Sequence, residues 1–100
     1  MFESLSFSMI GLEHYFYWQK QDKRTLNKIN KLIIDIMRNG NEGIGHPEPL
    51  KHDKQGKWSR EIDEKNRLVY KILDDNRVEI YHCSVPYCRM LSGFCCKVNS

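Results

Sequence analysis

Apolar and polar positions change period along this chain, and the changes predict where its elements lie. Residues 5–9 alternate apolar and polar side chains, which predicts a short strand. Residues 12–19 are rich in aromatic side chains and predict a short helix, although their composition also permits a strand. Asp22 is a favoured N-cap and Gly40 a favoured stop, so the two bound a second helix. Its apolar stripe recurs at helical spacing and consists of Leu26, Ile29, Leu32, Ile33 and Ile36.

The second half of the chain predicts a loop followed by three strands. Residues 39–49 hold three glycines and two prolines and predict a loop. Strands are expected at 56–62, 66–73 and 78–83, because turn-favouring residues separate them. The order of elements predicts an α+β fold, with two N-terminal helices packed on one face of a small, mainly antiparallel sheet. We expect one domain over residues 1–87 and a divergent tail over 88–100.

The composition of the chain restricts the class of protein. The chain has 100 residues, of which 40% are hydrophobic and 29% charged, as in a soluble globular domain. A net charge of +3 is compatible with a nucleic-acid partner but does not demand one, since many soluble domains have the same balance. No apolar run approaches the roughly 18 residues of a membrane helix, and the N-terminus lacks signal-peptide features. We therefore expect a cytoplasmic protein that has no membrane partner.

The four cysteines lie in the last fifth of the chain. In a reducing compartment they are expected to be free thiols. Their spacing, with His82 beside the first, matches no common zinc finger or ribbon. We therefore expect neither a metal nor another cofactor. The cysteines are Cys83, Cys88, Cys95 and Cys96.

Glu48 is the first residue that could do chemistry. Pro47 and Pro49 flank it, restrict the backbone to extended conformations and remove two amide donors. The carboxylate is thus presented from a stiff loop, as a general base taking the proton of a ribose 2′-hydroxyl would need to be. The alternative interpretation is an ordinary solvent-exposed loop glutamate.

Three cations accompany this carboxylate. Lys51 follows closely, Arg60 lies in the strand at 56–62, and Arg67 begins the next strand. In antiparallel neighbours joined by a short turn, such positions can lie close in space. Arginine binds phosphate oxygens in a bidentate way and stabilises the charge of a pentacoordinate transition state. The alternative is ordinary sheet-edge charge, paired with Glu61, Asp63 and Glu64.

Other polar and aromatic residues have plainer interpretations. Trp58 and Tyr70 are expected to pack in the core or on the sheet face. The helix after Asp22 carries a basic face, which is either a solvated surface or a contact with RNA phosphates. The remaining histidines are interpreted as incidental surface residues: His14, His46 and His52.

Several ordered motifs resemble one known family. They are YFYWQ at 15–19, DKR at 22–24, EGIGHPEPLK at 42–51, GKWSR at 56–60 and RLVY at 67–70. Together they are similar to the YoeB/Txe toxins of the RelE superfamily, which belong to bacterial toxin–antitoxin modules. The resemblance runs from about residue 7 to residue 83 and keeps the order and spacing of the motifs.

The resemblance implies a fold, an activity and partners. Family members are small ribonucleases with a microbial-RNase-like sheet and two N-terminal helices, and they cleave mRNA in the ribosomal A site. It implies metal-independent attack of the 2′-oxygen on phosphorus, which leaves a 2′,3′-cyclic phosphate and a 5′-hydroxyl. Glu48 matches the general base, and Lys51, Arg60 and Arg67 match residues that bind or stabilise the phosphate. YefM/Axe-type antitoxins cover the active site of such toxins, and many of the toxins form homodimers.

Two departures from the family pattern matter. The family usually has a second arginine where this chain has Glu61. Its last strand ends in a His-Tyr pair whose histidine is the general acid, and here the pair is Pro86-Tyr87. His82 would lie on the same face as position 86 in a regular strand, but about 13 Å away. We therefore keep His82 and Tyr87 as candidate catalytic residues. The alternative function is a catalytically impaired relative that binds antitoxin or ribosome.

Overall fold

A computed structural model of the chain describes residues 2–51, 56–73 and 76–83. In chain order the elements are β1 (Ser4–Phe7), α1 (Met9–Gln21), α2 (Lys23–Asn39), β2 (Glu48–Pro49), β3 (Trp58–Glu61), β4 (Arg67–Leu73) and β5 (Arg77–His82). The five strands form one sheet in the order β1-β5-β4-β3-β2.

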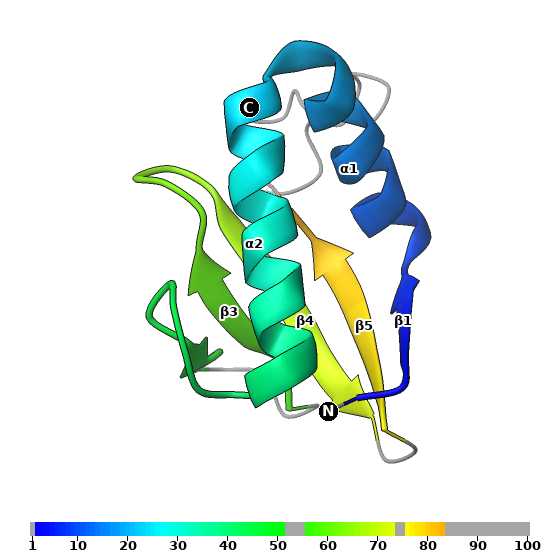
Figure 1. Cartoon of the computed structure of the whole chain (residues 1–100), viewed down its shortest axis with the longest axis vertical. Helices are drawn as coiled ribbons and strands as arrows, with labels where there is room; N and C mark the ends of the chain where they lie inside the picture. The colour runs from blue at the N-terminus through cyan, green and yellow to red at the C-terminus, as the bar shows by residue number, and fades with distance from the viewer. Residues whose placement is uncertain (1, 52–55, 74–75, 84–100) are drawn as a thin grey trace.

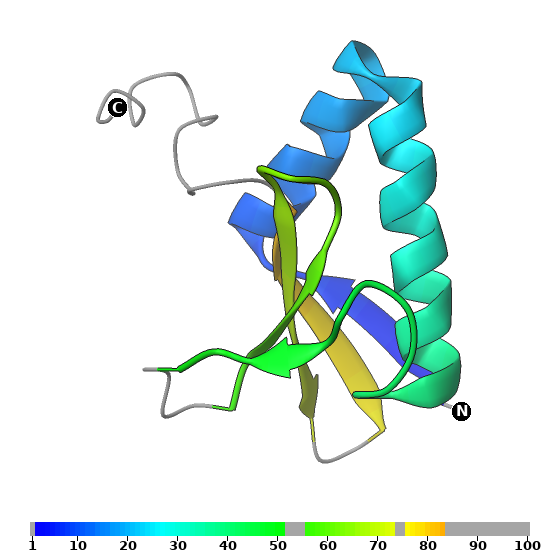
Figure 2. The same ribbon diagram turned by 90° about the vertical axis from the view of Figure 1, so that its left-hand side faces the viewer.

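The two helices lie side by side on one face of the sheet (Figures 1 and 2), as the α+β prediction required. The pairs β2–β3, β3–β4 and β4–β5 are antiparallel, whereas β1 runs parallel to β5. The parallel pair is possible because the helices and the meander separate the two strands in the chain. None of the helices in the described residues is long and apolar enough to cross a membrane.

Helix α2 carries the side chains that form much of the core. The Asp22 side chain accepts hydrogen bonds from the backbone N–H groups of Arg24 and Thr25, so it caps the helix as predicted. Gly40 ends the helix with φ at 69°, a conformation that disfavours other residues. Four residues of the predicted stripe are buried against β4 and β5, and each contributes roughly 1.5–3 kcal/mol. They are Ile29, Leu32, Ile33 and Ile36.

Residues 48–49 correct the predicted loop. They form β2, where Glu48 is the partner of Ser59 and Pro49 the partner of Trp58 in β3. A two-residue strand has no visible period in the sequence. Proline, which usually indicates a loop, is tolerated here because β2 is an edge strand whose outer side needs no donor.

Helix α1 packs directly against the backbone of β5. Gly11 makes this approach possible, because a Cβ atom there would lie 2.5 Å from the carbonyl oxygen of Ile80. One turn later His14 Nδ1 accepts a hydrogen bond from the backbone N–H of Cys83 (3.1 Å). The indole N–H of Trp18 donates to the carbonyl oxygen of the same cysteine (2.8 Å). Three residues on one side of α1 therefore hold the end of β5.

The expectation that His14 is an incidental surface residue was wrong. Its side chain is fully buried, because residues 9–21 form a helix whose inner side faces β5. Burial and, after it, the charge of the His82 ring, 5.8 Å away between ring centroids, lower the pKa of His14 to about 4. His14 is therefore neutral at pH 7, which its role as a hydrogen-bond acceptor requires.

This histidine makes stability depend on pH. Between pH 6.5 and about 4 the unfolded chain binds a proton at His14 that the folded protein does not, so stability falls as pH is lowered. We expect the free energy of unfolding to lose up to about 1.4 kcal/mol per pH unit from this group. In His14→Asn an amide oxygen can still accept the hydrogen bond from the Cys83 N–H, but the side chain does not titrate. The free energy of unfolding of this variant should therefore depend less on pH, which urea denaturation at several pH values measures.

His46→Asn is the matched control, because His46 is exposed in a loop. It should keep the wild-type dependence on pH. If the free energy of unfolding fell equally steeply with pH in wild type and in His14→Asn between pH 6 and 4.5, this account of His14 would be contradicted.

Candidate functional site

The candidate site lies on the sheet face that the helices leave uncovered. Arg60 in β3 is buried with the core, so its neighbour Ser59 points to the opposite face. Glu48 is the cross-strand partner of Ser59 and shares that face. Arg67 at the start of β4 is the partner of Glu61 and lies there too. Three strands thus bring Glu48, Ser59 and Arg67 together.

Arg67 is held at two of its nitrogen atoms. Its Nε donates to Ser59 Oγ (3.1 Å), and its Nη2 donates to Glu48 Oε2 (3.1 Å). The Arg67 side chain is 37% exposed and that of Glu48 60% exposed, so the ion pair is open to solvent. An exposed pair of this kind adds at most about 1 kcal/mol to stability. The arrangement therefore does little for the fold and leaves a carboxylate and a guanidinium accessible to a ligand.

Lys51 ends the described segment that carries Glu48. It is exposed, and among the described residues it makes no hydrogen bond or ion pair. The preceding residue is fixed, since the Leu50 N–H donates to the carbonyl oxygen of Lys57 (3.0 Å). Lys51 thus lies three residues after Glu48, just beyond β2, and its contact with phosphate stays a prediction.

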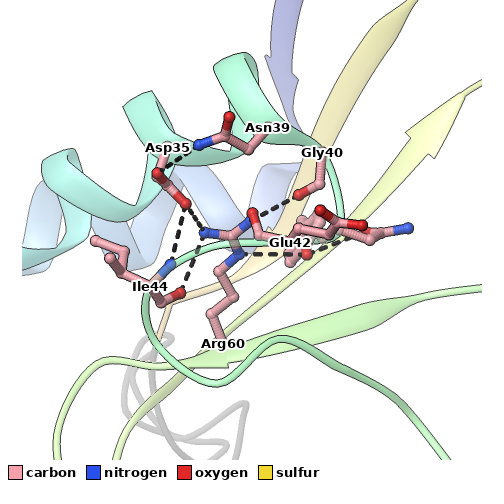
Figure 3. Close-up of polar contacts among 8 residues, drawn as sticks. Asp35, Asn39, Gly40, Glu42, Ile44 and Arg60 are labelled. Carbon is pink, nitrogen blue, oxygen red and sulfur yellow. Dashed lines mark hydrogen bonds and ion pairs between the residues drawn. The ribbon is translucent and has the colours of Figure 1, made fainter.

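Arg60 does not belong to this exposed group, which corrects the expectation that it binds phosphate. Its side chain is fully buried on the helix side of the sheet. All of its N–H groups are used. Nε donates to the Tyr70 hydroxyl. Nη1 donates to Asp35 and to the Ile44 carbonyl, and Nη2 donates to the carbonyls of Gly40 and Glu42 (Figure 3). The prediction failed because Arg60 and Arg67, although in neighbouring strands, point to opposite faces of the sheet.

The Arg60 guanidinium instead anchors the loop that leads to Glu48. It binds three carbonyl oxygens within residues 40–44, and Asp35 also accepts a hydrogen bond from the Ile44 N–H (3.1 Å). The hydrogen bond from Arg60 is the main cause that lowers the pKa of Asp35, which keeps this carboxylate charged. Gly43 fits tightly against it, because a Cβ atom there would overlap the carboxylate of Asp35. The loop is therefore held from its inner side.

His82 is the β5 partner of Val69, which in turn is the β4 partner of Ser59. It ends β5, and its ring lies beside that of His14 in α1. The pairing of β4 with β5 is irregular at Val69 and Tyr70, so regular alternation does not extend to His82. Burial and, after it, the charge of Lys57 lower the pKa of His82, which favours the neutral ring at pH 7. No hydrogen bond between His82 and either Glu48 or Arg67 occurs within the described residues.

Tyr87 and Pro86 lie outside the described residues, as do His52, the three later cysteines and the predicted tail at 88–100. Cys83 is described and is a buried free thiol, whose pKa burial raises to about 12.

Sequence reasoning missed Ser59, Asp35 and Tyr70 as partners of the two arginines. Ser59 could have been found from register, since it lies two residues before the partner of Arg67 on the same side of β3. Asp35 carried no comparable signal, because its contact joins a helix to a strand that lies 25 residues away in the chain.

Comparison with known proteins decides the family. A family model described as the YoeB-like toxin of bacterial type II toxin–antitoxin systems matches residues 7–87. The chain belongs to this toxin family. It is 46% identical to the toxin YoeB of Streptomyces coelicolor over 81 residues, which cover 78% of this chain and 96% of that protein. Over 64 residues it is 55% identical to the toxin YoeB of Escherichia coli K12, covering 64% of this chain and 76% of that one.

A solved structure agrees. The YoeB chain in a YoeB–YefM complex from Staphylococcus aureus superimposes with a TM-score of 0.76 at 44% identity, covering 83% of this chain and 95% of that one. The YoeB-like fold and sequence are thus shared over the described segments that carry Glu48, Ser59 and Arg67. This protein is a YoeB-family toxin of a type II toxin–antitoxin system.

The two arginines should behave differently when truncated. Arg60→Ala leaves Asp35 and three loop carbonyls without their donor, and we expect a loss of about 3 kcal/mol or more in the free energy of unfolding. Arg67→Ala removes an exposed ion pair and one hydrogen bond to the buried Ser59 hydroxyl, and the loss should be smaller, at about 1–2 kcal/mol. Urea denaturation of both variants measures the difference, and similar losses would contradict the assignment of Arg60 as the buried anchor.

Proposed function

We propose that this toxin is a ribosome-dependent endoribonuclease that cleaves mRNA by metal-independent acid–base chemistry. The observation that carries the proposal is the exposed pair of Glu48 and Arg67, 3.1 Å apart, on an uncovered sheet face. A carboxylate beside a fixed guanidinium is what transfer of a ribose proton and stabilisation of a phosphate require. Membership of the YoeB-like family supports the same conclusion.

In the proposed reaction Glu48 takes the proton of the 2′-hydroxyl. The freed 2′-oxygen attacks the adjacent phosphorus, the bond to the 5′-oxygen breaks, and a 2′,3′-cyclic phosphate and a 5′-hydroxyl remain. Arg67 stabilises the negative charge that develops on the phosphoryl oxygens. Lys51, which is exposed three residues after Glu48, adds attraction for the RNA backbone.

The leaving 5′-oxygen needs a proton, and the two candidates differ. His82 is the residue of β5 proposed from the sequence, but burial and the charge of Lys57 lower its pKa, which disfavours the protonated ring that a general acid needs. Its ring also lies beside that of the buried His14. These observations favour Tyr87 as the proton donor, since in the sequence it directly follows the position of the family's histidine.

A second function is favoured by two particular residues. Glu61 places a carboxylate at the cross-strand position opposite Arg67, which weakens the attraction for phosphate. Pro86 replaces the family's histidine, and a general acid typically contributes about a hundred- to ten-thousand-fold in rate. A toxin relative that cleaves slowly and acts by binding antitoxin or ribosome is therefore the alternative.

The proposed partners follow from the related structures. One S. aureus structure is described as a YoeB–YefM complex and another as a YoeB dimer. We propose that a YefM-type antitoxin binds this toxin over the face that carries Glu48 and Arg67, and that the toxin forms a homodimer. We place it in the cytoplasm, where both the ribosome and the antitoxin are found.

Cleavage of mRNA in a reconstituted translation system tests the function. The wild type should cut within A-site codons, and Glu48→Gln should lower the rate by at least about a hundred-fold, because the amide cannot accept the ribose proton. Glu64→Gln, which alters an exposed carboxylate in the turn after β3, should cut like the wild type. Primer extension locates the cuts.

Two outcomes would decide against this function. Equal cutting by wild type and Glu48→Gln would remove Glu48 as the base. Intact mRNA with folded wild-type protein would favour the alternative in which the toxin acts by binding.

A further inference from the structure

We propose that Ser59 is a positioning residue that fixes the Arg67 guanidinium for phosphate binding. The proposal rests on the proposed cleavage reaction, and it assigns a role to a residue outside the acid–base pair. Ser59 does not touch the reacting atoms in this scheme. It acts through Arg67, to which it is joined by a hydrogen bond of 3.1 Å.

Two contacts on different nitrogen atoms define the orientation of a planar group. Ser59 Oγ accepts from Nε of Arg67, and Glu48 Oε2 accepts from Nη2. The bond to Glu48 alone would allow the guanidinium to turn about that contact. With Nε also held, Nη1 and the second proton of Nη2 keep one orientation, and in the described residues neither donates a hydrogen bond. These are the donors that a phosphate can accept from.

The exposure of Ser59, Arg67 and Glu48 agrees with a positioning role for Ser59 and a role in ligand contact for the other two. Ser59 is 2% exposed, whereas the Arg67 side chain is 37% exposed and that of Glu48 60%. A buried hydroxyl in a strand has few alternative partners and does not exchange them with water. A free arginine side chain samples many rotamers, and the hydrogen bond to Ser59 limits this sampling before the phosphate arrives.

The backbone of Ser59 is itself fixed from both sides. Its Cα atom is paired with that of Glu48 in β2 and with that of Val69 in β4. The next residue, Arg60, is locked into the core by its buried guanidinium. The Glu61 N–H donates to the carbonyl oxygen of Gly45 (2.7 Å), within the loop that leads to Glu48. Strand β3 thus holds Arg67 from one face and the Glu48 loop from the other.

Loss of the hydroxyl should affect turnover more than binding. Arg67 gains most of its interaction when charge develops on the phosphoryl oxygens, so its orientation matters in the transition state. A hydrogen bond to a charged group is worth about 1.5 kcal/mol or more, which corresponds to a fall in kcat of about ten-fold in Ser59→Ala. KM should stay within about two-fold, because Lys51 and the ribosome contacts are unchanged.

The kinetic test compares three variants in ribosome-dependent mRNA cleavage. Ser59→Ala should show the lowered kcat, and Ser59→Thr, which keeps a hydroxyl on a strand residue, should restore it. Ser6→Ala is the matched control, because Ser6 lies in β1 and its buried Oγ has no hydrogen-bond partner among the described residues. Wild-type kcat in Ser59→Ala, or failure of Ser59→Thr to restore a lowered kcat, would overturn the proposal.

A second measurement does not depend on cleavage. The Nε–Hε signal of Arg67, assigned in the NMR spectrum by its loss in Arg67→Lys, reports directly on the bond to Ser59. We expect its exchange with water to be at least about ten-fold faster in Ser59→Ala than in wild type, Ser59→Thr or Ser6→Ala. Unchanged exchange would overturn the proposal for Ser59. Wild-type protein that leaves mRNA intact would instead overturn the proposed function, and the exchange rates would still decide whether Ser59 holds Arg67.

Discussion

The buried guanidinium of Arg60 is the contact on which the arrangement of the site depends. It lies in the core with no exposed surface, and each of its N–H groups meets an acceptor from helix α2, the 40–44 loop or β4. A buried charge of this kind is tolerated only when its partners are complete. Asp35 supplies the opposite charge, and the loop carbonyls supply the remaining acceptors. These contacts fix the conformation of the loop, and the loop in turn places Glu48 in the edge strand β2.

Strand β3 links this buried contact to the exposed chemistry. Consecutive residues of a strand point to opposite faces, so Arg60 can anchor the loop while Ser59 holds Arg67 on the other side. A second arrangement of the same type occurs at β5, where α1 approaches closely through Gly11 and holds Cys83 through His14 and Trp18. In both places a buried polar side chain holds the backbone next to the end of a strand.

Local features of the sequence were sufficient for most of the fold. The N-cap at Asp22, the apolar stripe of α2 and the stop at Gly40 are encoded within neighbouring residues, and the structure confirms them. The parallel pairing of β1 with β5 and the two-residue strand β2 were not predictable, because they depend on contacts between distant segments. Glu48 and Arg67 were brought together as expected, whereas Arg60 was assigned to the wrong face. A difference of one residue in register decides that face, and neither composition nor spacing reveals it.

The most direct test of this account is a structure of the toxin on a ribosome whose A-site mRNA carries a 2′-deoxy nucleotide at the cleavage position, so that the bond stays intact. The account predicts that the scissile phosphate contacts Arg67 and that the 2′ carbon lies next to Glu48, with room for a hydroxyl within about 3.2 Å of its carboxylate. Arg60 should remain bound to Asp35 and the loop carbonyls. A phosphate bound by Arg60, or an mRNA path that does not reach the face of Glu48 and Arg67, would contradict the account.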